Sequence, residues 1–178
     1  FSVGMAATSF LGLTISNFDK VALAFLGSNQ NISMYILAFT AASVLQLIIQ
    51  PFYKTFYPIF SELQRHPKKL ESAFKNASKY FSVLIFPVYL FALVFAEELI
   101  FTWIGMDDGQ LITIFRILLT CFLFTGLVWL PAAYQQAKSI TNIHNSMMLI
   151  SIILGVITFI LFHQSMGIIA FCLIWFFH

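Results

Sequence analysis

Long apolar stretches separated by short polar ones dominate the chain. Crossing the hydrocarbon core of a bilayer takes about 20 helical residues, and the chain offers about five apolar runs near that length and the start of a sixth. The predicted spans cover residues 1–26, 34–60, 80–96, 111–130, 147–162 and 167–178. The pattern therefore predicts an all-α protein, a multi-pass bundle of five to six transmembrane helices.

Several of these apolar runs contain a proline, and others reach the ends of the chain. Pro51, Pro58 and Pro87 lie inside predicted spans, where a membrane helix tolerates a proline as a kink. The fourth span is predicted to close at Pro131. Both chain ends fall within apolar runs, so we expect a fragment of a longer protein, with further helices on each side.

The polar connections between the spans carry charges of opposite sign. The connection between the second and third spans holds five of the nine basic residues, namely Arg65, Lys68, Lys69, Lys75 and Lys79. The next connection holds acids and no Lys or Arg, namely Glu97, Glu98, Asp107 and Asp108. Because loops rich in Lys and Arg are retained in the cytoplasm, we expect residues 61–79 to be cytoplasmic.

Apolar residues recur at helical spacing within this basic connection. Leu70, Phe74, Ala77 and Phe81 follow one another at offsets of four, three and four, the spacing of one helix face. The pattern is compatible with a short amphipathic helix, and equally with an ordinary solvated connector leading into the third span.

Composition narrows the function classes. Hydrophobic residues make up 60% of the chain and charged residues only 9%, whereas about a quarter of a soluble domain is charged. The sequence contains no nucleotide-binding loop, serine hydrolase motif or zinc protease motif, so we expect no enzyme. The four histidines are widely spaced and the net charge is only +2, so we expect no metal, no cofactor and no nucleic acid partner.

Polar residues inside the second span are the first candidates for function. Ser43, Gln46, Gln50 and Lys54 follow offsets of three, four and four, which places them on one face of a helix. Such a stripe suits a water-filled path or an anionic substrate. The alternative is that the glutamines bond a neighbouring helix while Lys54 extends to the membrane surface.

Three further charged residues are candidates for the substrate path. Asp19 and Lys20 are adjacent, so they point in different directions on a helix and do not pair across one face. They lie within the bilayer if the first span reaches Leu26, and at its surface if the span ends near Ser16. Arg116 follows the start of the fourth span by five residues, where extension to the nearby surface explains it best.

Several segments resemble polysaccharide flippases of the multidrug, oligosaccharidyl-lipid and polysaccharide exporter superfamily. The segments NFDKVALAFLG (17–27), MYILAF (34–39) and YPIFSE (57–62) resemble the seventh and eighth helices of these flippases. The pair Phe86-Pro87 with AEELIFTWIG (96–105) resembles their proline-bearing helix and its acidic exit. The segment YQQAK (134–138) is similar to the loop after their tenth helix, although the glycine usual in that loop is replaced here.

The resemblance implies a fold and a function. The family builds two six-helix bundles around a cavity that opens to each side in turn, so the chain would be the C-terminal bundle, with its N-terminal counterpart as partner. The implied substrate is an undecaprenyl diphosphate-linked oligosaccharide, carried across the cytoplasmic (inner) membrane for O-antigen or another surface polysaccharide. A cationic cavity would then neutralise the diphosphate.

Other functions remain open at this point. A multidrug or cation antiporter of the same superfamily would favour acidic residues within the spans. A membrane-embedded enzyme of a polysaccharide pathway would need a catalytic constellation at the membrane surface. A purely structural membrane subunit would make the polar stripe a set of helix contacts.

Overall fold

The computed structural model of the chain describes residues 29–105, 107–138 and 141–166, together with positions 6, 9, 10, 13, 172 and 175. Every element in these ranges is helical. The elements are α2 (Asn29–Val44), α3 (Gln46–Glu62), the short 3₁₀ helix η1 (Leu63–Arg65), α4 (Pro67–Val94), α5 (Ala96–Ile104), α6 (Gly109–Ala137) and α7 (Thr141–Met166). The predicted spans 1–26 and 167–178 lie outside these ranges, apart from single positions.

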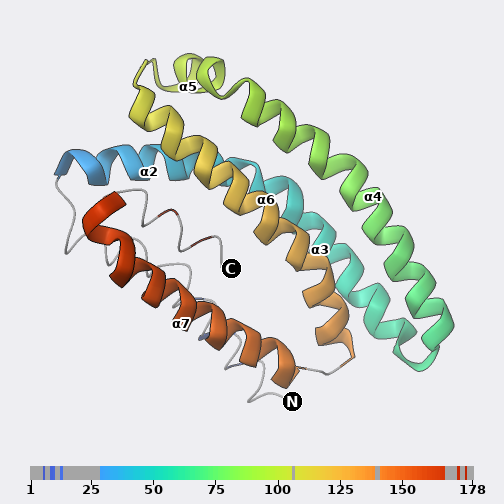
Figure 1. The fold of residues 1–178 in the computed structure, drawn as a ribbon. Coiled ribbons are helices and arrows are strands. Elements are labelled where there is room, and N and C mark those ends of the chain that lie inside the picture. Colours follow the sequence, from blue (N-terminus) through green and yellow to red (C-terminus); the bar gives the residue numbers. More distant parts are fainter. Residues whose placement is uncertain are drawn as a thin grey trace.

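Helix α6 forms the centre of the described bundle. It contacts α2, α3, α4, α5 and α7, and α4 and α7 lie on opposite sides of it (Figure 1). Its buried side chains include Leu118, Leu119 and Phe122. By contrast, α7 exposes most of its described apolar side chains and buries Gly155 and Phe159. The core therefore lies where α2, α3 and α4 meet α6.

The predicted second span is broken into two helices. Helices α2 and α3 meet at Leu45 with a bend of 45°, and the amide of Leu45 donates to the carbonyl of Ala42 in a tight 3₁₀-type turn. The amide of Ile48 likewise donates to the carbonyl of Leu45 at 3.2 Å, so two tight turns in succession interrupt the α-helical hydrogen bonds at this point. The span predicted over residues 34–60 thus corresponds to two helices that meet at a bend.

Helix α4 joins the basic connection and the third span in one continuous element. It begins at Pro67, a residue favoured in the first helical turn, and runs to Val94 without a break. Leu70, Ala77 and Phe81 are buried. The basic connection is thus helical from Pro67 with one buried face, as the amphipathic pattern indicated, but it forms the start of α4 rather than a separate short helix.

Local sequence explains the ends of α5 and the start of α6. Gly105 has a φ of 73° and closes α5, a left-handed conformation that glycine adopts without steric cost. The Asp108 carboxylate then accepts hydrogen bonds from the amides of Gln110 and Leu111 at 2.8 and 3.1 Å, which caps α6. Helix α6 continues through Pro131, the predicted end of the fourth span, to Ala137.

Small residues let the helices approach one another. Ala38 and Ala42 are fully buried and one turn apart on α2, which contacts α6. Gly126 of α6 is buried against the side chain of Ile49 on α3. Close packing of small residues is how helices associate in a membrane, where apolar burial alone gives little driving force.

The length and composition of these helices identify a membrane protein. Two helices, α4 and α6, are long and apolar enough to cross a bilayer, and the bent pair α2–α3 makes a third if it counts as one span. Within α7, the apolar helix over residues 145–161 is shorter. The described residues thus contain two to three candidate spans, and the predicted count of five to six is not confirmed.

Candidate functional site

The predicted polar stripe lies largely on one flank of α3. Gln46, Gln50 and Lys54 keep their four-residue spacing within this helix; both glutamines are half-buried and Lys54 is exposed. Ser43 belongs to α2 instead, and its hydroxyl donates to the carbonyl of Thr40 at 2.8 Å. The break at Leu45 therefore separates Ser43 from the stripe, because helical spacing does not carry across a bend.

This flank offers polar groups that the rest of the described bundle leaves open. Among the described residues, none forms a hydrogen bond or ion pair with the side chain of Gln46, Gln50 or Lys54. An amide both donates and accepts, and an ammonium group donates three hydrogen bonds. The flank can therefore bind hydroxyl groups and an anion.

A partly buried hydrogen-bonded pair that sequence analysis missed borders this flank. The Tyr53 hydroxyl donates to Gln136 Oε1 on α6 at 2.6 Å, and Gln136 is only 7% exposed. The ring of Tyr53 stacks on Tyr57 at 6.0 Å and meets Trp129 edge-on at 5.9 Å. In the sequence, only the tyrosines Tyr53 and Tyr57, four residues apart beside the stripe, could have indicated this pair. Gln136 lies 83 residues from Tyr53 in sequence, so its role could not be predicted.

Aromatic residues join α3, α4 and α6 at the basic end. The Tyr134 ring lies 4.7 Å from Phe74 and 5.9 Å from Phe60. Lys138 Nζ lies 4.5 Å from the centre of the Tyr134 ring, a cation–π distance. The segment YQQAK (134–138) is thus the last turn of α6 and its C-cap, where the sequence suggested a loop.

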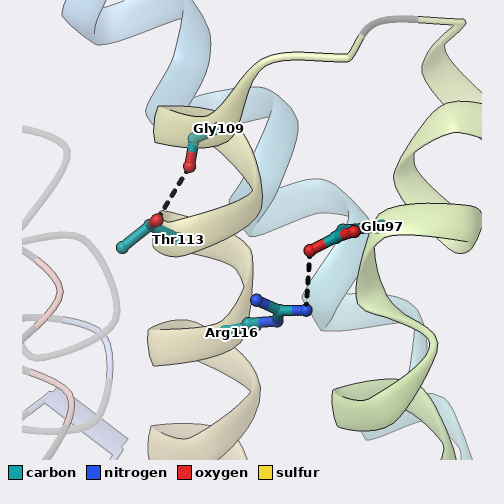
Figure 2. Close-up of polar contacts among 4 residues, drawn as sticks. All are labelled: Glu97, Gly109, Thr113 and Arg116. Atoms are coloured by element: carbon teal, nitrogen blue, oxygen red, sulfur yellow. Dashed lines mark hydrogen bonds and ion pairs between the residues drawn. The ribbon is translucent and has the colours of Figure 1, made fainter.

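Arg116 pairs with an acid near the opposite end of α6. Its Nη2 lies 3.1 Å from Glu97 Oε1 in the first turn of α5, as Figure 2 shows, and their side chains are 44% and 62% exposed. Nearby, the Thr113 hydroxyl donates to the carbonyl of Gly109. Exposed ion pairs contribute little to stability in water, so this pair chiefly positions the Arg116 side chain.

The candidate residues do not form one cluster. Tyr53, the residue before Lys54, contacts Trp129 and Gln136 of α6, so Lys54 lies at the level of these two residues. Arg116 precedes Trp129 by 13 residues on α6, or about 20 Å along the helix axis. Asp19 and Lys20 lie outside the described residues. Within the described part of the chain, no group of three His, Cys, Asp or Glu side chains could hold a metal ion.

Comparison with known proteins adds a family. The model of a family described as polysaccharide biosynthesis protein matches residues 1–107, a range that contains α2, α3, α4 and α5. Among curated proteins and solved structures, none matches the chain significantly. The match and the apolar helices indicate a membrane protein with a role in polysaccharide biosynthesis or export. The matched range covers more than half of the chain, which therefore belongs to the polysaccharide biosynthesis protein family.

Proposed function

We propose that the chain forms one bundle of a transporter that moves undecaprenyl diphosphate-linked oligosaccharide across the cytoplasmic membrane. The polymer made from this substrate would be O-antigen or another surface polysaccharide. The second bundle of the same protein would supply the opposite wall of the path. Transport of this kind needs no catalysis by the chain.

The family match carries this proposal. The matched residues 1–107 include the polar flank of α3 and the whole of α4. A polysaccharide made from lipid-linked units requires a membrane protein that moves these units between leaflets. The match supports this reading over a drug or cation antiporter, because the family description concerns polysaccharide.

The polar flank of α3 supports the assignment of a substrate path. Gln46 and Gln50 are half-buried on a largely apolar helix, and Lys54 ends the stripe with a positive charge. Polar groups within a span are costly in lipid and typically face a hydrated cavity or a partner helix. Lys54 would attract the diphosphate, while the glutamines would contact sugar or water.

Substitution of Lys54 in the full-length protein tests the path. We expect Lys54→Ala to insert and accumulate normally but to reduce surface polysaccharide at least several-fold, because the cation that attracts the diphosphate is lost. Lys54→Arg should retain part of the activity, because the charge survives. The measurements are protein abundance in the membrane and surface polymer in cells that lack the native protein.

Two comparisons make this experiment decisive. Lys69→Ala removes an equal charge from the exposed surface of α4 and should leave export unchanged. Export at the unmodified rate by Lys54→Ala would remove Lys54 from the path. If the purified full-length protein does not accelerate movement of a fluorescent lipid-linked oligosaccharide between the leaflets of liposomes, the proposed transport itself is wrong.

A further inference from the structure

The outward face of α4 changes character abruptly along a single helix. Opposite its buried face, the helix exposes positions at helical spacing, namely Lys68, Lys75, Lys79, Val83, Phe86 and Leu90. Val83 and Leu90 are 67% and 53% exposed. The stripe is therefore cationic up to Lys79 and apolar from Val83 onward, on one continuous outward face.

A change of this kind is expected where a helix enters the hydrocarbon core. The exposed Val83, Phe86 and Leu90 face away from the described bundle, and a span covers such side chains with lipid. Lys79 lies one turn before Val83, about 6 Å along the axis, and Lys75 lies about 12 Å before Val83. The polar headgroup layer is roughly 5 to 8 Å thick on each side of the hydrocarbon core, so Lys79 is level with it. Lys75 lies just beyond its outer margin, from where its long side chain can extend back to the phosphates.

The two lysines carry charges that the described part of the chain leaves unpaired. No carboxylate among the described residues lies within ion-pair distance of Lys75 or Lys79. The apolar face of the same segment is occupied, because Leu70 and Ala77 are buried against the bundle. The segment therefore packs its apolar face against the bundle and directs its lysines outward.

We propose that Lys75 and Lys79 form a binding site for the headgroup phosphate of anionic phospholipids. The continuity of the lysines with the lipid-covered stripe identifies the occupant, because a partner protein at this level would have to displace lipid along the same face. Lys68 lies about 17 Å from Lys79 along the axis, beyond the headgroup layer and beyond the screening length of about 8 to 10 Å. Lys75 and Lys79 should therefore dominate the interaction.

Lipid selectivity of the whole chain in reconstituted vesicles tests this site. Spin-labelled phosphatidylglycerol and phosphatidylcholine report the relative association of each lipid with the chain in vesicles of both lipids. We expect the unmodified chain to prefer phosphatidylglycerol. Lys75→Gln with Lys79→Gln should reduce this preference several-fold, with about fivefold per lysine as the upper bound, which is about 1 kcal/mol near an anionic surface. High salt should weaken the preference of the unmodified chain.

Matched variants separate the site from net charge and from misfolding. Lys68→Gln with Lys69→Gln removes an equal number of charges from the same helix and should leave most of the preference for phosphatidylglycerol in place. Lys75→Arg with Lys79→Arg should retain it, and the helical content of every variant is checked by circular dichroism. The proposal is overturned if the Lys75/Lys79 glutamine variant folds and keeps its preference, or if the Lys68/Lys69 variant loses as much.

Discussion

Gly126 allows α6 to pack directly against the side chain of Ile49. A Cβ atom at this position would lie 2.5 Å from Ile49 Cδ1, so Gly126→Ala should force Ile49 out of its buried conformation. Overpacking of this kind typically costs about 1 to 3 kcal/mol. We expect Gly126→Ala to lower the midpoint of thermal unfolding in detergent, as measured by size-exclusion chromatography after heating.

Two variants give this prediction its controls. Gly109→Ala places the same methyl group where no atom lies within 4 Å, and should be close to neutral. Ile49→Val removes Cδ1, and the nearest remaining atom, Cγ1, lies at 3.6 Å, an ordinary contact. The double variant Gly126→Ala/Ile49→Val should therefore lose less stability than the sum of the single variants. Strict additivity would contradict the proposed clash.

At the scale of elements, the hydrogen bond between Tyr53 and Gln136 ties α3 to α6. Tyr53→Phe removes the donor and leaves the buried amide oxygen of Gln136 without it, which should cost about 1 to 3 kcal/mol. Tyr57→Phe is the matched control, because the Tyr57 hydroxyl makes no hydrogen bond among the described residues. Equal thermal stability of the two variants would show that this hydrogen bond does not stabilise the packing of α3 against α6.

The sequence predicted elements better than their junctions. Apolar runs placed α6 and α7 within a few residues of their observed centres, and Leu70 and Ala77 correctly indicated the buried face of α4. The break at Leu45 was missed because hydrophobic periodicity continues through it, and only the local hydrogen bonds define it. Because of this break, Ser43 does not share a helix face with Gln46, Gln50 and Lys54.

The candidate site was predictable only where its residues share one helix. Gln46, Gln50 and Lys54 lie together on α3 as their spacing indicated. Gln136 could not be connected to them from sequence, because its link to Tyr53 depends on how α6 packs across α3. Whether these residues form a substrate path stays a prediction.

At the scale of the whole molecule, opposite charges gather at opposite ends of the bundle. The turn between α3 and α4 lies near the end of α6, whereas α5 lies near its start (Figure 1). We expect the basic end to face the cytoplasm, because basic segments resist translocation. A cysteine at Ser72 should therefore be protected from an impermeant reagent on intact cells, and one at Gly109 should be labelled.

The structure favours these two positions for labelling. Ser72 and Gly109 are both exposed, and a side chain at Gly109 meets no atom within 4 Å. The native Cys121 and Cys172 are buried, so they should give little background. Labelling at Ser72 with protection at Gly109 would mean that the orientation is inverted.

The proposed two-bundle architecture predicts that the 178-residue chain does not transport by itself. An alternating-access path needs two walls, and the polar flank of α3 supplies groups for only one of them. Liposomes holding the purified chain should therefore move a fluorescent lipid-linked oligosaccharide no faster than empty liposomes, whereas liposomes holding the full-length protein should move it faster. Circular dichroism of the reconstituted chain must show intact helices, so that inactivity is not mistaken for unfolding. Transport by the folded chain alone would exclude the two-bundle architecture while leaving the family and its membrane location intact.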